Sequence, residues 1–572
     1  MNEVINSQNL MGKFIRYRRI VLLIVLVCIL SASFLYSLVA SMPMIFKKDL
    51  YAHDESSNSV VAANITRKIF PPMVRVNPLN EEQGNWMEGP YWQHIPPIFA
   101  YVPYLGFLLD GKISIEVKRL SFAMLELLTA LLFVTGIYWV TKRLFYSFTA
   151  TLASFFWLNN FFTRDLVLGT KFGVSDIVLA FFVVLAFLGI AKYLSIERNN
   201  RITISLKSLI FIALLTTLPI LAKNLLGLIP LILFCVLLVR DIGVKNRKFW
   251  ISLITATGLL IVYYGLFFLS SPMTFLQEIL TSINHFTNYE GWARPWHYYI
   301  SYYLPADYLK DYTALFWIAL FTGVLGLFMP LKRKNLLFLG FLYFIWNLAT
   351  ISVISSKTPN FLYQSLLLIF FFIITANFQI LAKWVKFPQV GIKLSIVLLI
   401  ISASTFIFSS FNFATAIYTN RVIPYAYDSE HEQFYLLAEH LEQKNVNLND
   451  LVIFDYSPSD CWTRYYTLFL TGAESKTLLE MYFDLNKPDI LKKYSNVYLI
   501  RSFDNRTKIN SFSQSQISTF VIDQFVVNEK SLNAVKNYID SRHNQHAQEI
   551  ERIKKDKTSC QWLVPDLILN AH

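Results

Sequence analysis

Long apolar runs recur through the first 413 residues of the chain, and most of the polar connections between them are short. Most of these runs approach the roughly 20 residues that an α-helix needs to cross a hydrocarbon core about 30 Å thick. Because lipid offers no partners for backbone N–H and C=O groups, such runs must be helical. The pattern predicts a polytopic α-helical membrane protein with about 11 transmembrane helices, over residues 20–41, 118–140, 148–163, 174–194, 206–221, 225–240, 250–269, 313–331, 335–354, 360–382 and 391–413.

Basic residues follow the same segmentation. Every second connection is short and basic, as in "FIRYRR" before the first span, "TKR" after the second and "LKRK" after the eighth. This alternation is typical of cytoplasmic loops, so the N-terminus is expected in the cytoplasm and the protein in the cytoplasmic (inner) membrane. An odd number of spans then places the C-terminal part on the opposite, periplasmic or extracellular side.

Composition agrees with this topology. Hydrophobic residues make up 55% of the chain and charged residues 16%, whereas soluble domains contain about a quarter charged residues. The formal net charge of +13 lies mostly in the short connections, so we expect membrane lipids as partners and no nucleic acid. The 4 cysteines form no zinc-ribbon or disulfide-rich pattern.

Three longer segments are expected outside the cytoplasm: residues 42–117, 270–312 and the tail from about 420. In the first, Val61, Ile65 and Ile69 recur at helical spacing, which predicts a helix lying in the membrane interface. The stretch "YWQHIPPIFAYVPYLGFLL" is broken by prolines and is expected to skim or dip into the membrane. We therefore predict a transmembrane domain over 1–419, which includes the loop 42–117, and a soluble extracytoplasmic α/β domain over 420–572.

The α/β prediction for the tail comes from alternating patterns. "DSEHEQFYLLAEHLEQKN" is typical of an amphipathic helix, and "LVIFDY", "NVYLIR" and "TFVIDQFVV" are typical of strands. Cys461 and Cys560 both lie here, where they either form a disulfide or stay unpaired. Asp455 and its polar neighbours are interpreted as surface groups.

Candidate chemistry gathers at the predicted external ends of the spans. Ionisable groups near a bilayer are costly unless they face water, a partner or a ligand. Asp54, Glu55 and Asp176 offer bases, and four cations offer phosphate-binding groups: Lys171, Lys223, Arg294 and Lys357. A base beside a phosphate clamp suits glycosyl transfer from a lipid phosphate, since the base takes the acceptor's proton and the cations stabilise the departing phosphate.

Six short motifs, in order, carry a family resemblance. They are "HDES" after the first span, "YWQHIPP", "GVSDIVLAFF", "LAKNLLGLIP", "NHFTNYEGWARPWHYY" and "SSKTPNFLYQ". Over about residues 15–380 this layout resembles the GT-C superfamily of polytopic glycosyltransferases, and within it the protein mannosyltransferases and the aminoarabinose–lipid A transferases.

The resemblance implies a fold, a reaction and roles. It implies a GT-C membrane domain that moves a sugar from a polyprenyl-phosphate donor to an extracytoplasmic acceptor, with inversion and no required cofactor. Asp54 matches the family's loop carboxylate and proposed base, and Asp176 its second acidic position. Lys223 and Arg294 match cations near the lipid phosphate.

One motif departs from the family. The bacterial members have Glu-Lys before Pro-Pro, whereas this chain has His94-Ile95, so Lys171, Lys357 or Arg294 would replace the missing phosphate-binding lysine. His285 matches a histidine that helps to hold a metal ion, and with His94 it offers a possible site for a divalent metal such as zinc.

Plainer explanations exist for each residue. Asp54 and Glu55 also suit a solvated loop or the N-cap of the helix through Val61, and Asp176 a helix cap. The lysines suit interfacial anchors, Arg294 an aromatic belt and the histidines hydrogen-bonded loop positions. A transporter or flippase of a charged lipid or glycan would place the same charges along a path.

Overall fold

The computed structural model describes most of the predicted membrane core and of the tail. The described residues are 20–32, 53–68, 97–158, 175–196, 198–270, 295–298, 313–353, 362–384, 429–455, 461–478, 490–502, 513–517 and 520–555, with single positions in 17–46, 272–279 and at 481. By its internal contacts the chain forms two compact units. The first is Met1–Phe46, Arg119–Leu266 and Ile283–Pro424, and the second is Lys47–Lys118, Phe267–Ser282 and Tyr425–His572.

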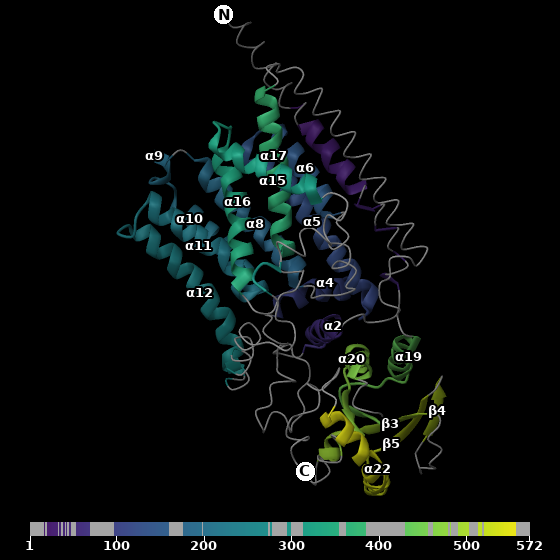
Figure 1. Cartoon of the computed structure of the whole chain (residues 1–572). Helices are drawn as coiled ribbons and strands as arrows, with labels where there is room; N and C mark the ends of the chain where they lie inside the picture. The colour runs from purple at the N-terminus through teal and green to yellow at the C-terminus, as the bar shows by residue number, and fades with distance from the viewer. Residues whose placement is uncertain are drawn as a thin grey trace, which may run out of the picture. The chain divides into compact units, whose positions relative to one another are not determined.

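Apolar helices make up the described part of the first unit and run alongside one another (Figure 1). They are α5 (Ile115–Thr141, whose first residues belong to the second unit), α6 (Leu144–Leu158), α8 (Ser175–Ser195), α10 (Leu206–Ala222), α11 (Asn224–Asp241), α12 (Arg247–Ser270), α15 (Thr313–Phe328), α16 (Lys334–Val353) and α17 (Tyr363–Trp384), with the short α9 (Arg198–Arg201). Helix α8 packs on α10, α10 on α11, and α17 on α6, α15 and α16. Helix α17 is largely enclosed, since Tyr363–Phe372 are all buried.

Five described helices are long and apolar enough to cross a membrane: Ile115–Thr141, Asp176–Ser195, Arg247–Ser270, Lys334–Val353 and Tyr363–Lys383. All five fall on predicted spans. Helices α6, α10 and α15 are apolar but shorter than 18 residues. Helices that could cross a membrane are therefore confirmed at five of the predicted spans, and the total of about 11 stays a prediction, as does the orientation.

The second unit joins the segment predicted as the first external loop to the tail. The loop contributes α2 (His53–Thr66), the 3₁₀ turn η2 (Pro97–Ala100) and α4 (Tyr101–Asp110). Helix α4 has 10 residues, about 15 Å, and is too short to cross a membrane. It ends at Gly111, whose φ of 77° lets its N–H return to the Phe107 carbonyl.

The predicted helix through Val61 and Ile65 is present as α2, but its setting differs from the expectation. Val60, Val61, Ala62 and Ala63 are all buried, so apolar side chains face more than one side of the helix. They are covered by α4 and by α20 (Cys461–Leu470) of the tail. A helix enclosed by protein in this way does not present a single apolar stripe to lipid.

A five-stranded mixed sheet forms the centre of the tail. Its strands are β1 (Asp450–Phe454), β2 (Glu474–Thr477), β3 (Asn496–Ser502), β4 (Ser513–Ile517) and β5 (Phe520–Val526), in the order β2-β1-β3-β5-β4. Strands β2, β1 and β3 are parallel, and β5 runs antiparallel to both β3 and β4. The three stretches predicted as strands coincide with β1, β3 and β5.

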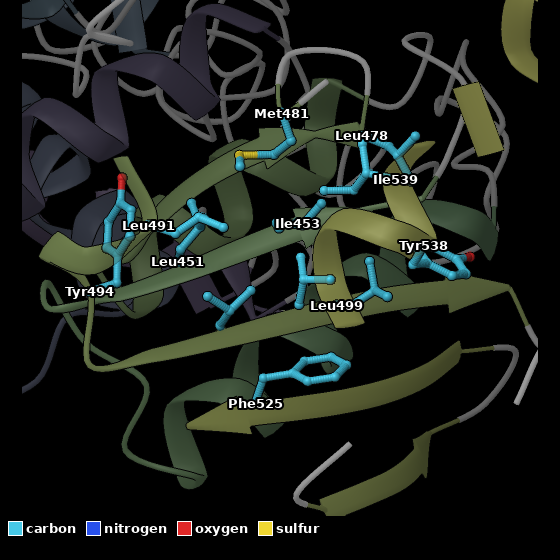
Figure 2. Packing of buried hydrophobic residues seen from close by; sticks show 12 residues of the cluster. Leu451, Ile453, Leu478, Met481, Leu491, Tyr494, Leu499, Phe525, Tyr538 and Ile539 are labelled. Carbon is cyan, nitrogen blue, oxygen red and sulfur yellow. The ribbon is translucent and has the colours of Figure 1, made fainter. Parts of the chain in front are cut away.

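Alternation along these strands builds two apolar layers, one on each face of the sheet. On one face Leu451, Ile453, Leu499 and Phe525 pack with Ile539 of α22 (Glu529–Lys555), as Figure 2 shows. On the other face the strands pack against α19 (Ser429–Gln443), with residues Val452, Phe454, Ile500, Ile522, Leu437 and Leu441. A short 3₁₀ turn, η5 (Ile490–Lys493), precedes β3. That the tail is an independent extracytoplasmic domain, with a boundary at 419/420, stays a prediction.

Candidate functional site

Two of the predicted site residues form a buried ion pair in the first unit. The Nζ atom of Lys223 donates to Oδ1 of Asp176 at 2.6 Å. The Asp176 side chain is fully buried and the Lys223 side chain is 12% exposed. Asp176 lies in the first turn of α8, where a helix favours a negative charge. The sequence had assigned the two residues separately, one as an acid and the other as a phosphate ligand.

A tight connection between α10 and α11 fixes the position of Lys223. Lys223 is the single residue between the two helices, with an extended backbone at φ −158° and ψ 83°. Its N–H donates to the Pro219 carbonyl, and its carbonyl accepts from the Gly227 N–H at 2.8 Å. A Cβ at Gly227 would lie 2.1 Å from the Pro219 oxygen, so only glycine allows the first turn of α11 to pass so close to α10.

This geometry decides what the pair can do. Removing two charges from water is costly, and the cost is offset only while the partners stay together. Asp176 therefore does not lie in the described structure as an isolated base. It holds the ammonium of Lys223 in place, and a fixed ammonium can stabilise negative charge that develops during a reaction.

The structure places Asp54 and Glu55 in the first turn of α2. Their backbone is therefore helical, whereas the plainer explanations were a solvated loop or the N-cap of this helix. Their side chains lie outside the described part. The two positions are about 100° apart around the helix axis, so one reacting group cannot use them in the same way.

The other predicted site residues cannot be placed. Lys171, Arg294, Lys357, His94 and His285 lie outside the described residues. Among the described residues, no group of three or more His, Cys, Asp and Glu side chains could hold a metal ion. A metal held through His94 and His285 stays a prediction, and so does the gathering of Asp54, Lys223 and Arg294 around one substrate.

A buried acid in α5, a helix long and apolar enough to cross a membrane, was not among the predicted site residues. Glu126 of α5 is 2% exposed, and its Oε1 accepts a hydrogen bond of 3.2 Å from the hydroxyl of Tyr363 on α17. The Tyr363 ring packs on the indole of Trp157 at 5.1 Å between centroids. The signal was a single glutamate inside the apolar run "AMLELLTALL", which by itself marks a candidate functional residue.

Further buried polar groups lie on α16 and α17. The amide of Gln364 donates to the side-chain oxygen of Asn347 at 2.9 Å, and Asn347 donates to Ser365 at 3.0 Å. Within the described part of the chain, the buried Nε1 of Trp157 has no hydrogen-bond partner. Buried polar groups are normally paired, so this cluster stands out from an apolar helix interface.

Two buried cations at the start of α5 were also missed. Lys118 and Arg119 are 1% and 2% exposed, and Arg119 donates to the Ile45 carbonyl at 3.4 Å. Both lie at the predicted external end of their span. The positive-inside rule places basic residues mainly in cytoplasmic connections, so two basic residues at a predicted external end are an exception. This exception could have marked them as candidate functional residues.

In the tail, the interpretation of Asp455 as a surface group is wrong. Asp455 directly follows β1, and its side chain is fully buried. It accepts hydrogen bonds from the hydroxyl of Tyr538 and, at 3.3 Å, from Nε of Arg542, both on α22. Nearby in the sheet Arg501 donates to Asp523 at 2.6 Å with both side chains buried. The carboxylate thus holds α22 against the end of β1.

Comparison with solved structures identifies the fold. The chain superposes on ArnT from Cupriavidus metallidurans bound to undecaprenyl phosphate with a TM-score of 0.55 and 12% identity, covering 86% of this chain and 98% of that one. The apo state of the same protein gives a TM-score of 0.51 and 12% identity, with 85% and 97% covered. No protein-family model and no curated protein match the sequence. The chain therefore has the fold of these ArnT structures, and its membership of the GT-C superfamily stays a prediction.

Proposed function

We propose that the chain is an integral-membrane glycosyltransferase that moves a sugar from a polyprenyl-phosphate carrier to an acceptor outside the cytoplasm. The acceptor is a lipid, a glycan or a protein, and the enzyme lies in the cytoplasmic membrane with its tail outside. The observation that carries the proposal is the Lys223–Asp176 ion pair, buried in a chain with the fold of ArnT. The ArnT structure holds undecaprenyl phosphate, which is the chemical class of the carrier that leaves in the proposed reaction.

The reaction is a single in-line displacement. Asp54 takes the proton of an acceptor hydroxyl as the hydroxyl oxygen attacks the anomeric carbon of the sugar. The bond from that carbon to the phosphate oxygen breaks, its electron pair stays on the oxygen, and polyprenyl phosphate leaves. Since the attack comes from the face opposite the phosphate, the anomeric configuration inverts.

The cations of the site stabilise the leaving phosphate. Lys223, held by Asp176, supplies a positive charge that does not have to reorganise during the reaction. Lys171, Arg294 and Lys357 are proposed as further phosphate ligands. Glu55 is proposed as a second acidic residue of the same loop. His94 and His285 would hold a divalent metal ion such as zinc if one is bound, and no step of the reaction is assigned to it.

Mass spectrometry of the cell envelope tests this function. Lipids, glycans and proteins are compared between cells with the wild-type protein, cells with the Asp54→Asn variant and cells without the protein. We expect one acceptor class to gain the mass of one sugar only with the wild type. Identical envelopes in all three strains would contradict the proposal.

One observation favours a second candidate, a flippase or transporter of a charged lipid or glycan. Glu126 is buried within a membrane-spanning helix, as the acids that line transport pathways are. The two functions separate by mutation. If the protein is an enzyme, Asp54→Asn abolishes sugar transfer and Glu126→Gln reduces it less. If it is a transporter, Glu126→Gln reduces lipid translocation more than Asp54→Asn does.

A further inference from the structure

Arg67 links the first external loop to the tail within the second unit. It directly follows α2, and its guanidinium donates to three consecutive carbonyls at the C-terminal end of α20. Nη1 donates to Leu468 at 3.1 Å, and Nη2 donates to Phe469 at 2.6 Å and to Leu470 at 2.9 Å. We call these four residues the Arg67 clasp.

The clasp satisfies groups that a helix cannot satisfy by itself. The last four carbonyls of an α-helix have no intrahelical partner. The Leu468 carbonyl also accepts from the Gly472 N–H at 3.1 Å, whereas Arg67 supplies the donor that the structure shows for Phe469 and Leu470. A cation at this end also complements the negative end of the helix dipole. Arg67 therefore caps a helix that lies 401 to 403 positions away in the sequence.

Gly472 shows how closely the chain fits around this arginine. Its φ is +74°, which side chains other than glycine rarely adopt. A Cβ there would lie 2.8 Å from Nε and 2.9 Å from Cδ of Arg67. Substitution would therefore strain the backbone and displace the arginine.

Electrostatics agree with a tightly held guanidinium. Burial lowers the pKa of Arg67 to about 10, and the nearby Glu442 carboxylate opposes this shift. Glu442 is on α19, so the cation also interacts electrostatically with a second helix of the tail. Arg67 stays charged at neutral pH.

Apolar contacts lock the same helices together. Helix α2 packs along α20 through its buried centre, and the two lie side by side in Figure 1. The ring of Phe107 on α4 lies 6.2 Å from that of Phe469 on α20. Helix α20 thus contacts two elements of the loop.

We propose that Arg67 is a positioning residue for the reaction, because it fixes the helix that carries Asp54. Asp54 lies 13 residues before Arg67, about 20 Å along the helix axis. Because α2 is a continuous helix, anchoring its C-terminal end through Arg67 also restricts the position of its first turn. The tail is then a required part of the enzyme, since it holds the reactive loop from outside. This inference rests on the proposed function only in its claim that Asp54 is the base.

The test compares Arg67→Gln with Lys68→Gln in the full-length protein. Lys68 is exposed and loses the same charge one position later, so it is the matched control. We expect Arg67→Gln to lower kcat about tenfold with little change in the KM for the donor, and Lys68→Gln to stay within about twofold. Arg67→Lys should recover part of the loss, because an ammonium can still donate to these carbonyls.

Two further measurements show how Arg67 acts. Hydrogen exchange should increase over residues 53–66 in Arg67→Gln while β1 and β3 stay protected. In the Asp54→Asn background, Arg67→Gln should cause no further loss of transfer, since a residue that acts through Asp54 has nothing left to position. If Arg67→Gln does not accumulate in membranes, Gly472→Ala replaces it, because the added Cβ displaces the arginine without removing its charge.

Unchanged exchange over 53–66 together with unchanged kcat would overturn the proposal. So would a loss of transfer that is equally large in the Asp54→Asn background. Because the exchange measurement needs no activity, a chain that transfers no sugar but loses protection over 53–66 in Arg67→Gln would refute the proposed function while supporting the clasp.

Discussion

The ammonium of Lys223 lies 2.6 Å from the carboxylate of Asp176, although the two residues are 47 positions apart and belong to different elements. One residue opens α8, and the other occupies the single-residue connection between α10 and α11. The pair links three neighbouring helices of the first unit, α8, α10 and α11. The two charges neutralise each other, so replacing only one residue leaves the other buried without its partner.

Replacing Lys223 by Met should remove transfer and destabilise the protein. The change leaves the Asp176 carboxylate buried without its cation, which costs about 3–5 kcal/mol in comparable buried pairs. We expect transfer to fall by about a hundredfold or more. Transfer assays and thermal unfolding in detergent measure the two effects.

The double variant Lys223→Met with Asp176→Leu separates stability from function. Neutral side chains of similar size often restore the stability lost with one partner of a buried pair. The unfolding temperature should recover, while transfer should stay low because the cation is still absent. Recovery of both would show that the pair has only a structural role.

Asp54→Asn should lower kcat by about 10² to 10⁴, the range typical for loss of a general base. Asparagine keeps the shape of the side chain and suits the start of a helix, so expression and unfolding temperature should not change. Glu55→Gln is the control at the next position, and its effect should be smaller. Equal, small effects of both changes would exclude Asp54 as the base.

Gly227→Ala tests the connection that holds Lys223. The new Cβ would meet the Pro219 carbonyl at 2.1 Å, and backbone atoms cannot move aside as a flexible side chain can. We expect a loss of about 2 kcal/mol or more, in the upper part of the range for overpacked sites. Gly258→Ala in α12 is the control, because its Cβ meets no atom within 4 Å and alanine favours a helix by up to about 1 kcal/mol. Thermal unfolding distinguishes them, and similar stability of both variants would contradict the geometry.

His440 on α19 predicts a pH dependence of the tail. Burial, and then the charge of Lys444, hold the pKa of His440 below its ordinary value of 6.5. The unfolded chain therefore binds the proton more tightly, so stability decreases as pH falls from above 6.5 through the lower, folded-state pKa. Unfolding of wild type and His440→Leu is compared between pH 7.5 and pH 5. The variant should lose less stability on acidification, and parallel curves would refute this role.

The periodicity of apolar residues predicted the helices and strands better than it predicted which side chains contact one another. The run at Asn496–Arg501 and the helix through Val61 could be recognised locally, because spacing along the chain reflects burial of one face. The motifs around Asp176 and Lys223 marked both as candidates. Their ion pair could not be predicted, because it depends on how α8 packs on α10. Each residue alone also suited a structural role, Asp176 as a helix cap and Lys223 as an interfacial anchor.

Three residues show what local patterns miss. Glu126 is one acid in a long apolar run, and averaging over a window hides it. Arg67 follows a helix and has the sequence context of any surface cation, while its carbonyl partners lie about 400 residues later. Asp455 follows a short strand, as turn residues do, and only the packing of α22 shows that it is buried.

A structure determined experimentally with bound polyprenyl phosphate tests the central claim most directly. The account predicts that the phosphate group contacts Lys223. It also predicts that the Asp54 carboxylate faces the same pocket, on the side from which the acceptor would attack. A separation of more than roughly 20–24 Å, about two helix diameters, between Asp54 and both Lys223 and Arg294 would contradict it.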